Sequence, residues 1–480
     1  MKSIGFTPYL PIRRLKRCFE RGEIAPLIRE IPFDQDPWEI FLKVTNPSAR
    51  FFLDSGKQRS KNAAFSYFGS DPFLIVRKKG KENLLPVLRK LFQKYKSPAF
   101  PEIPFATGGA FGYLGYALAW EFENLPKSRK SKTDFNDALF LFVKNFFVFD
   151  HAKSKFYFIS NLIPEKGISF ESALDQAKRW MDGVGTAPKG TGLSTFSTRF
   201  SIQNFKADVS KKTFKQMVAR AKKYIEAGDI YQANLSQRFS FNFDGAPETL
   251  YETLRNINPS PFASFFQVDD MVVISSSPER LVSKRGFHVE TRPIAGTRPK
   301  GKTARETQQL RIELLKNAKE RAEHIMLVDL ERNDLGRVCK PHTVRVSEMM
   351  ALEEYSHVIH IVSNVVGEMD PKKDQFDLIQ AMFPGGTITG CPKVRCMEII
   401  EELEPFARGL YTGSLGFMGF NGDLDLNIII RTILLNKKRG YFQVGAGIVY
   451  DSNPEREYWE TIYKGRALVE ALQFNRDKFL

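Results

Sequence analysis

Two pairs of glutamates have the spacing of a carboxylate metal site. Glu320 and Glu323 lie three residues apart in KERAEHIMLVDL, and Glu457 and Glu460 lie three residues apart in NPEREYWETIYKG. Residues three apart on a helix share one face, and two such faces brought together would supply the hard oxygen ligands that Mg²⁺ prefers. Because a glutamate on a helix is usually solvated, the spacing alone leaves surface charge as the alternative.

Four glycine-rich segments are candidates for binding an anion. They are PIAGTRPKG (293–301), FPGGTITGCPKVR (383–395), YTGSLGF (411–417) and VGAGIVYD (444–451). Glycine lets the backbone approach a ligand closely and direct N–H groups at it, which suits a phosphate or a carboxylate. None contains the GxxxxGK[ST] pattern of a nucleotide-binding loop. Ordinary turns remain the alternative for each segment taken singly.

Three further side chains suit a substrate that carries carboxylates. Arg431 lies in NIIIRTI, which predicts a strand, and Lys464 follows Glu460 by one helical turn. Either cation can pair with a carboxylate, the arginine through a bidentate fork. His360, on an apolar predicted strand, is a candidate proton donor, although a lone histidine in such a place is more often structural.

Composition excludes several classes of protein. The net charge of +16 comes mainly from residues 1–200, which hold 32 Lys and Arg against 19 Asp and Glu. These cations are scattered and form no nucleic-acid-binding module, so a solvated surface explains them. No apolar run reaches the roughly 18–20 residues of a membrane helix, and we expect no secretory signal. The four cysteines form no CxxC pair, which favours reduced thiols in the cytoplasm.

The pattern of elements favours an α+β fold with antiparallel sheets. We expect helices over 211–227, 303–328, 391–404 and 454–471, and strands over MVVISSS, HVIHIVSNVVG and YFQVGAGIVYD. The segment 182–204, rich in Gly, Ser and Thr, predicts a linker or a long surface loop. These elements must bring the glutamates, glycines and cations together.

Taken together, these motifs resemble those of the chorismate-utilising enzymes. That family includes the large subunits of anthranilate synthase and aminodeoxychorismate synthase, and the isochorismate and salicylate synthases. The matching strings are GDIYQANLSQRF (228–239), SSPERL (276–281), TRPIAGTRPKG (291–301), RAEHIMLVDLERNDLGRV (321–338), YSHVIHIVS (355–363), FPGGTITGCPKVRCMEIIEELE (383–404), GDLDLNIIIRT (422–432) and VGAGIVYDSNPEREYWETIYK (444–464). RFFLDSG (50–56), SYFGSDP (66–72) and GGAFGYLGY (108–116) resemble its N-terminal region, although Ala117 stands where the family often has Asp.

The resemblance implies a role for each candidate residue. Mg²⁺ would be bound by Glu323 and Glu460, with Glu320 and Glu457 supporting it through water. The metal would hold the ring carboxylate of chorismate and polarise the ring for loss of the 4-hydroxyl. Gly445 and Gly447 would offer backbone N–H groups to a carboxylate. The enolpyruvyl side chain would be bound by Thr387, Tyr411 and Arg431. Lys464 would add positive charge near the ring carboxylate, and His360 would be the acid that protonates the departing hydroxyl.

Position 232 points to the aminating branch of the family. Isochorismate and salicylate synthases carry a Lys there that activates water, whereas this chain has Gln232 in IYQANLS. A glutamine is no base near neutral pH, while ammonia is already a nucleophile. We therefore expect ammonia, rather than water, to attack the ring.

The motifs disagree on which aminating enzyme the chain resembles. YQANLSQRF, SPER and FPGGTITG resemble aminodeoxychorismate synthase large subunits, many of which carry a nucleophilic Lys in PIKGT. Here Ala295 occupies that position, and PIAGT is the form typical of anthranilate synthase. We expect aminodeoxychorismate synthase component I, in folate synthesis, with anthranilate synthase component I, in tryptophan synthesis, as the alternative.

The resemblance also implies an architecture and partners. It predicts an anthranilate synthase component I-like antiparallel β-sandwich flanked by helices, with an N-terminal region over 1–200 that joins the same sandwich and a chorismate-binding catalytic domain over 205–475. No glutaminase domain is evident, so we expect a separate glutamine amidotransferase subunit to deliver ammonia. Asp54 and Ser55, with Pro261 and Phe262, resemble a tryptophan pocket of the family, where the amino acid is either a feedback inhibitor or a structural ligand.

Overall fold

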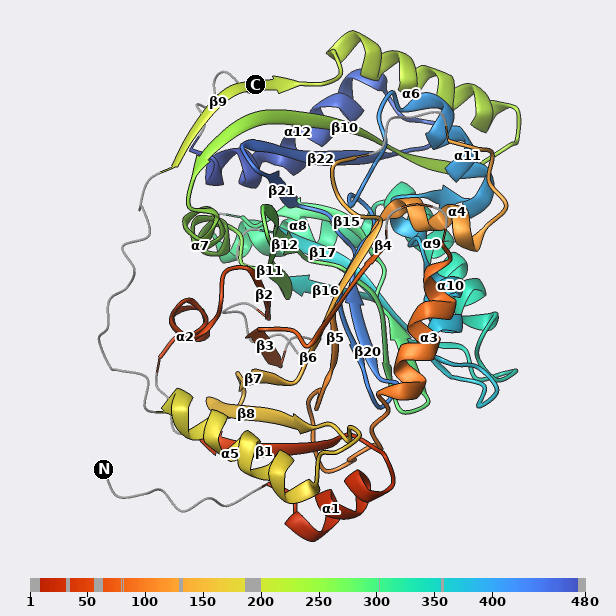
Figure 1. Ribbon diagram of the computed structural model, residues 1–480. Coiled ribbons are helices and arrows are strands. Elements are labelled where there is room, and N and C mark those ends of the chain that lie inside the picture. The colour runs from red at the N-terminus through yellow and green to blue at the C-terminus, as the bar shows by residue number, and fades with distance from the viewer. Residues whose placement is uncertain are drawn as a thin grey trace.

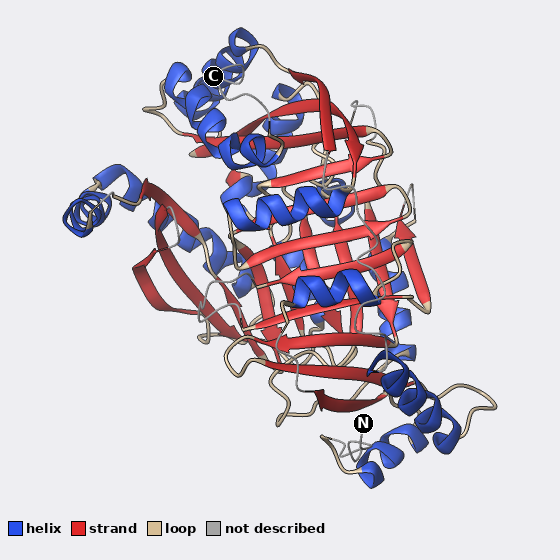
Figure 2. Ribbon diagram, turned by 90° about the vertical axis from the view of Figure 1, so that its left-hand side faces the viewer, coloured by secondary structure: helices blue, strands red, loops and turns tan. Residues whose placement is uncertain are grey.

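Two large antiparallel sheets form the body of the protein. The computed structural model describes residues 9–31, 35–55, 64–78, 80, 82–128, 133–185, 200–301, 303–354 and 358–473. Figure 2 shows the strands stacked as layers, with the helices on the outside and at both ends. The α+β fold with antiparallel sheets and flanking helices is therefore confirmed.

The first sheet has twelve strands and runs the length of the molecule (Figure 1). Its order is β1 (Ala25–Ile31), β8 (Lys155–Leu162), β7 (Asn145–Asp150), β3 (Phe65–Ser70), β2 (Ala49–Asp54), β11 (Phe262–Val268), β12 (Met271–Ser277), β21 (Thr432–Asn436), β22 (Arg439–Ile448), β10 (Gln232–Gly245) and β18 (Gly390–Cys391), and β9 (Phe200–Ala207) also pairs with β10.

The second sheet has ten strands. Its order is β15 (Ile294–Pro299), β17 (Val358–Glu368), β14 (His288–Thr291), β13 (Arg280–Arg285), β20 (Leu424–Asn427), β19 (Ser414–Gly419), β5 (Gly109–Leu114), β6 (Ala138–Val143) and β4 (Leu74–Lys78), and β16 (Arg345–Glu354) also pairs with β17. Strands from the first 200 residues enter both sheets, because β2 pairs with β11 and β5 pairs with β19. The N-terminal segment therefore shares the sandwich of the C-terminal segment, as expected.

Aromatic side chains fill much of the space between the sheets. Phe51 on β2 stacks on Phe111 on β5, with ring centroids 4.0 Å apart, and both rings are fully buried. This contact joins the first sheet to the second. A stack of this kind adds about 1 kcal/mol to the free energy of burying the two rings.

The helices cover the sheets and carry several of the candidate residues. They are α1 (Ile12–Glu20), α2 (Pro37–Val44), α3 (Leu84–Lys94), α4 (Ala119–Phe122), α5 (Phe170–Gly185), α6 (Lys211–Glu226), α7 (Pro247–Ile257), α8 (Ala304–Lys316), α9 (Ala318–Gly336), α10 (Gln375–Met382), α11 (Lys393–Leu403) and α12 (Pro454–Ala471), with short 3₁₀ turns η1 (Tyr116–Leu118) and η2 (Gly386–Ile388). Figure 1 shows α6, α11 and α12 around β10 and β22, and α9 and α10 beside the second sheet.

Side-chain caps fix where the two helices with the glutamate pairs begin. Asn317 accepts a hydrogen bond from the backbone N–H of Glu320 at the start of α9. Asn453 does the same for the first turn of α12, where Pro454 occupies the first helical position. Both arrangements satisfy N–H groups that otherwise have no partner at a helix start, and they set the rotation of each glutamate pair about its helix.

Three sequence expectations need correction. The predicted helix over 303–328 is two helices, because Asn317 ends α8 and caps α9. The expected loop 182–204 is shorter than predicted, since α5 extends through 185 and β9 starts at 200; residues 186–199 lie outside the described part. Arg431 lies between β20 and β21 with φ of 50°, not on a strand.

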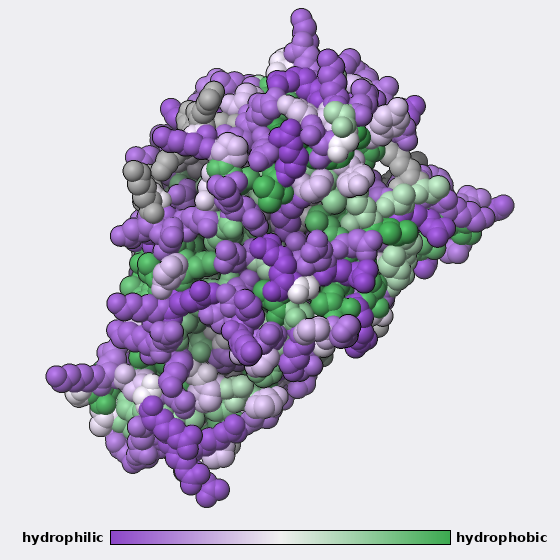
Figure 3. Space-filling view, turned by 90° about the vertical axis from the view of Figure 1, so that its right-hand side faces the viewer, coloured by the Kyte–Doolittle hydropathy of each residue, from purple (hydrophilic) through white to green (hydrophobic). Residues whose placement is uncertain are grey.

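One face of the protein is mainly hydrophilic. Figure 3 shows hydrophilic side chains over most of one face, with apolar areas scattered between them. In the described part of the chain, no helix is both long and apolar enough to cross a membrane.

Candidate active site

The pairing of β10 with β22 brings several predicted residues into one place. Gly447 lies opposite Asn234 and Gly445 lies opposite Ser236 in this antiparallel register. Gln232 begins β10 and also pairs with Cys391 of β18, the strand that directly follows η2. Segments that are more than 150 residues apart in sequence therefore meet at one end of the first sheet.

Gln232 contacts one of the predicted metal ligands. Its Nε2 donates a 2.9 Å hydrogen bond to Oε1 of Glu323 on α9, and the side chain is buried. A Cβ on Gly447 would lie 2.4 Å from Nε2 of Gln232 and 3.3 Å from Oε1 of Glu323. The glycine therefore leaves the space in which these two side chains meet.

Gly445 lies beside the phenol of Tyr411 and the amide of Asn234. A Cβ there would lie 2.7 Å from the Tyr411 hydroxyl and 2.4 Å from Oδ1 of Asn234. Lys464 of α12 donates from Nζ to the carbonyl of Gly445 at 3.2 Å and pairs with Glu460 at 2.8 Å. The structure thus gathers Gly445, Tyr411 and Lys464, three of the residues predicted to bind substrate.

Glu279 is a functional candidate that the sequence reasoning missed. This carboxyl precedes β13, is fully buried, and has its pKa raised to about 7, chiefly by burial. Thr387 and the backbone of Ile294 act in the opposite direction, as do the charges of Arg431 and Lys464. An acid that gains and loses its proton near neutral pH is suited to proton transfer. The signal was present, because Glu279 lies in the quoted string SSPERL.

His360 faces the same cations as Glu279. It lies on β17 as predicted, and burial, followed by the charge of Arg431, lowers its pKa to about 3. Its imidazole is therefore neutral at physiological pH. A neutral imidazole N–H donates hydrogen bonds but is a much weaker acid than a carboxyl.

Ala295 lies on β15, opposite Ile361 of β17, and is almost fully buried. Its neighbour Gly296 has φ of 68°, and a Cβ at Gly296 would lie 2.4 Å from Oε2 of Glu320. The segment PIAGT therefore packs against the first turn of α9. With a methyl group at position 295, this part of the site has no amine to act as a nucleophile.

The glutamate pair on α9 has the chemistry of a metal site. Glu320 pairs through Oε1 with Arg298 at 2.6 Å. Its other oxygen, Oε2, is buried, faces Gly296 and has no hydrogen-bond partner among the described residues. A buried carboxylate oxygen without a partner costs free energy, and a hard cation such as Mg²⁺ would satisfy it.

The glutamate pair on α12 differs between its two members. Glu457 is buried, whereas the side chain of Glu460 is 47% exposed and bonded to Lys464. Within the described ranges, no three acidic, His or Cys side chains lie close enough to enclose a metal ion. The α9 pair thus fits Mg²⁺ by donor chemistry, and the four-carboxylate site stays a prediction.

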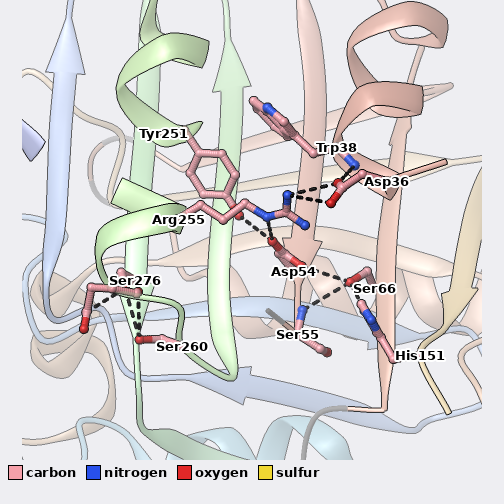
Figure 4. Close-up of polar contacts among 11 residues, drawn as sticks. Asp36, Trp38, Asp54, Ser55, Ser66, His151, Tyr251, Arg255, Ser260 and Ser276 are labelled. Atoms are coloured by element: carbon pink, nitrogen blue, oxygen red, sulfur yellow. Dashed lines mark hydrogen bonds and ion pairs between the residues drawn. The ribbon is translucent and has the colours of Figure 1, made fainter. Parts of the chain in front are cut away.

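Asp54, predicted for the tryptophan pocket, lies at the centre of a buried polar cluster (Figure 4). Arg255 of α7 donates from Nε to Asp54 at 2.5 Å and from Nη1 to both carboxylate oxygens of Asp36, at 2.9 and 3.1 Å. Ser66 donates to Asp54 at 3.2 Å and lies 2.7 Å from Nε2 of His151. Because the Ser66 hydroxyl has one proton, His151 donates from Nε2.

The ring of Trp38 lies beside this cluster. Trp38 is the second residue of α2 and is 2% exposed, and its ring packs on Phe41, Tyr251 and Phe265, with centroids 4.9, 4.6 and 5.5 Å away. Its indole nitrogen is buried and has no hydrogen-bond partner among the described residues. The aromatic space next to Asp54 is thus filled by a tryptophan of the chain itself.

The four residues predicted for the tryptophan pocket are neighbours, but they do not face one direction. Asp54 pairs with Ala263, which places Ser55 beside Phe262. The carboxylate of Asp54 points to α7, whereas the ring of Phe262 lies under the guanidinium of Arg280, 5.1 Å away, next to Pro261 in a shallow hollow. A tryptophan site here stays a prediction.

We expect Arg255→Ala to destabilise the protein by about 3–5 kcal/mol, because it leaves the buried Asp54 without its cation. Chemical denaturation followed by circular dichroism measures the change. The control is Arg77→Ala, which breaks the exposed pair of Arg77 with Asp269 and should cost less than about 1 kcal/mol. Equal losses in the two variants would contradict the role given to Arg255.

Comparison with known proteins shows the family of the chain. The model of the chorismate binding enzyme family matches residues 32–470. Aminodeoxychorismate synthase component 1 of Bacillus subtilis is 40% identical over 94% of this chain and 98% of its own length. Anthranilate synthase component 1 of Acetivibrio thermocellus is 39% identical over 97% and 98%.

A solved structure shares the fold. The crystal structure of anthranilate synthase component I from Streptococcus pneumoniae has a TM-score of 0.75 and 34% identity, over 86% of this chain and 93% of that one. The relatives divide between two reactions at nearly equal identity. The chain belongs to the chorismate binding enzyme family and is a chorismate-utilising enzyme of the anthranilate and aminodeoxychorismate synthase type.

Proposed function

We propose that the chain is aminodeoxychorismate synthase component I, which converts chorismate and ammonia to 4-amino-4-deoxychorismate. The observation that supports amination is the position of Gln232, whose side-chain amide donates a hydrogen bond to Glu323 within the site. An amide in this position cannot take a proton from water near neutral pH. Ammonia needs no such activation, so it is the nucleophile that this site can use.

Glu279 supplies the proton that the reaction needs. The 4-hydroxyl of chorismate leaves as water once it has accepted a proton from the Glu279 carboxyl. The incoming ammonia becomes an amine by losing a proton, and this proton restores the carboxyl. The sum is chorismate plus ammonia to the amino compound plus water. His360, neutral because of its burial and of Arg431, donates hydrogen bonds but gives up no proton.

The cations and glycines around Glu279 hold the two carboxylates of the substrate. Arg431 and Lys464 both act on Glu279 electrostatically, so their charges reach the centre of the site. The Tyr411 hydroxyl flanks the space left by Gly445, and Asn234, on the same space, donates to the backbone carbonyl of Thr387 at 3.4 Å. A dianion bound between these groups has its charge compensated in a poorly solvated place, where such interactions are strongest.

Mg²⁺ is the cofactor we propose, bound by Glu323 of α9 and Glu460 of α12, with Glu320 and Glu457 supporting it through water. When bound, it would neutralise the ring carboxylate and draw electron density from the ring. Arg298 and Lys464 neutralise Glu320 and Glu460 in the structure described here. These two cations keep the carboxylates compensated until the metal binds.

Ala295 is the observation that favours anthranilate synthase as a second candidate. A chain with a methyl group at this buried position of β15 offers no lysine for a covalent step at carbon 2. Direct attack of ammonia at carbon 2 leads to anthranilate after loss of pyruvate. Against this, YQANLSQRF, SPER and FPGGTITG support the folate reaction. The identities of 40% and 39% to a relative of each kind do not separate the two reactions. Either reaction draws ammonia from a glutamine amidotransferase partner, which we propose from the component 1 names of the relatives.

The product decides between the two reactions. We expect the purified chain, given chorismate, Mg²⁺ and ammonium salt, to form a compound that an added aminodeoxychorismate lyase converts to 4-aminobenzoate. Liquid chromatography separates it from anthranilate, which is fluorescent and needs no lyase. Anthranilate as the main product would replace the folate assignment with the tryptophan one, and no turnover of chorismate would refute both.

Glu279→Gln should lower kcat by about 10²–10⁴-fold, because the variant has no acid for the departing hydroxyl. In the unchanged protein, the protonated acid is lost as the pH rises through about 7. The rate per free ammonia should therefore fall above that pH, by about tenfold per unit. Steady-state assays at fixed free ammonia measure both effects. The control is Glu290→Gln, at a less buried carboxylate of β14 that pairs with Arg280, which should keep most activity.

Glu323→Gln should weaken the binding of Mg²⁺ by at least about tenfold, because an amide oxygen is a poorer ligand than a carboxylate. Isothermal titration calorimetry of the resting protein measures the affinity without turnover. Asp329→Asn provides the matched control, since Asp329 lies on the exposed side of the same helix. Equal Mg²⁺ affinity in the two variants would exclude Glu323 as a ligand.

A further inference from the structure

Arg408 and Glu404 form a buried ion pair to which the proposed function gives no role. Glu404 directly follows α11, and Arg408 lies four residues further on, with Nη2 2.8 Å from Oε1 of the glutamate. Only 2% of Arg408 and 1% of Glu404 is exposed. Burial removes both charges from water, and their attraction often does no more than offset that loss. The pair therefore adds little to stability, and its contacts indicate another role.

All five N–H groups of the Arg408 guanidinium donate hydrogen bonds. Nε and Nη2 bind the two carboxylate oxygens of Glu404, at 3.0 and 2.8 Å. Nη1 donates to the carbonyl of Ile388 at 2.9 Å and to the hydroxyl of Thr412 at 3.2 Å. The second N–H of Nη2 binds the carbonyl of Asn234 at 2.6 Å. Since an arginine has five such donors, this one side chain joins three separate segments to the end of α11.

Glu404 extends these contacts along β10. Its Oε1 accepts hydrogen bonds from the backbone N–H and from the hydroxyl of Ser236, both at 2.8 Å. Ser236 lies opposite Gly445 in the sheet, and Oδ1 of Asn234 borders the space left by Gly445. The ion pair therefore holds β10 at two residues beside this space.

The turn that carries Tyr411 is held by the same arginine. The backbone N–H of Tyr411 donates to the carbonyl of Arg408 at 3.0 Å, and the guanidinium lies 5.6 Å from the centre of the Tyr411 ring. The next residue, Thr412, has φ of 63°, a left-handed conformation that is strained for a β-branched side chain. Its hydroxyl is bound by Arg408 and its N–H by the carbonyl of Ile429 at 2.8 Å, and these contacts keep the strained residue in place.

Three consecutive carbonyls at η2 are held by two residues of this cluster. The side-chain amide of Asn234 donates to the carbonyl of Thr387 at 3.4 Å, and its backbone N–H donates to that of Thr389 at 2.9 Å. Between them, the carbonyl of Ile388 accepts from Arg408. The position of Thr387, predicted to bind the enolpyruvyl side chain, thus depends on the same contacts.

We propose that Arg408, paired with Glu404, is a positioning residue that fixes Tyr411, Asn234 and η2 around the space left by Gly445. Arg408 does not bind the substrate itself, because its N–H groups are all in use. It acts through Tyr411 and Asn234, which border that space. The inference rests on the proposed binding of chorismate there. A shift of about 1 Å in such groups can cost about 10²-fold in rate, so their positions need a rigid support.

Arg408→Lys keeps the charge and replaces the planar fork with one ammonium group. Three donors on a single nitrogen cannot serve the carbonyls of Asn234 and Ile388 together with Glu404. We expect the Kd of chorismate, measured by isothermal titration calorimetry with Mg²⁺ and without ammonium, to rise by about tenfold or more. Glu404→Gln combined with Arg408→Met leaves no buried charge and keeps an acceptor for Ser236. This double variant should weaken binding equally, and it replaces the lysine variant if that one folds poorly.

The control removes a similar ion pair elsewhere in the same sheet. Arg50 of β2 is 1% exposed, pairs with Glu248 of α7, and lies 5.2 and 5.3 Å from the ring centres of Phe41 and Phe265. Four strands lie between β2 and β10. Arg50→Met combined with Glu248→Gln should change the Kd of chorismate by less than about twofold, well below its melting temperature. An equal loss of affinity in the two double variants would mean that affinity follows stability, and would overturn the positioning role.

Thr412→Gly removes one contact of Arg408 without straining the fold. Glycine adopts the φ of 63° freely, so the variant should remain folded, but it lacks the hydroxyl that Arg408 binds. We expect the Kd of chorismate to rise by about threefold and Thr412→Ser, which keeps the hydroxyl, to restore it. Affinity equal to that of the unchanged protein in both Thr412→Gly and Arg408→Lys would contradict the proposal.

Hydrogen exchange of the resting protein tests the positioning without substrate. Followed by mass spectrometry, peptides over 386–389 and 408–413 should exchange faster in Arg408→Lys, whereas peptides of β2 should not change. Equal exchange at both segments would also overturn the proposal. Both candidate reactions start from bound chorismate, so anthranilate as the product would replace the folate assignment and leave the role of Arg408 intact. If the unchanged protein bound no chorismate, the proposed function would fail, and hydrogen exchange alone would decide whether Arg408 holds these segments.

Discussion

The antiparallel pairing of β10 with β22 is the constraint on which the rest of the site depends. It sets Gly445 and Gly447 opposite Ser236 and Asn234, and it fixes the position of Gln232 at the start of β10. Because α12 follows β22 after only a few residues, the same register also determines where Lys464 and Glu460 can lie. A slip of one residue would turn the glycines away from Gln232 and Tyr411 and close the space they leave.

Burial then gives the residues at this place their chemistry. Removal from water raises the pKa of Glu279 and lowers the pKa of His360, and each shift favours the neutral form of the side chain. The two effects differ in consequence. A carboxyl that stays protonated up to about pH 7 becomes an available acid, whereas an imidazole that stays neutral loses its ability to act as one. The protein thus assigns the proton to the carboxyl by burial, and the cations Arg431 and Lys464 keep the value of that carboxyl near neutrality.

Much of the fold and part of the site could be predicted from sequence. The helices α6, α11 and α12 and the strands β12, β17 and β22 were expected near their observed positions, since period and caps are local signals. The break at Asn317 was missed because both helices have favourable residues and only the cap divides them. Glu279 was missed as an acid because its pKa depends on burial and on neighbours more than 100 residues away, such as Thr387. Arg431 was placed on a strand since its neighbours are β-branched, yet its positive φ comes from the turn that joins two sheets.

The two ends of α9 compensate their buried carboxyls in different ways. At the N-terminal end, one carboxylate oxygen of Glu320 pairs with Arg298 and the other faces Gly296. This arrangement would allow a metal ion to replace Arg298 as the cation beside Glu320. At the C-terminal end, Asp334 holds Lys393 in a buried pair, and burial, followed by the charge of Asp334, raises the pKa of Glu331 to about 8. Both ends solve the same electrostatic problem of an acidic stripe packed against a protein interior. At the first end Arg298 offsets the charge of Glu320, and at the second end Lys393 offsets that of Asp334, while burial favours the neutral form of Glu331.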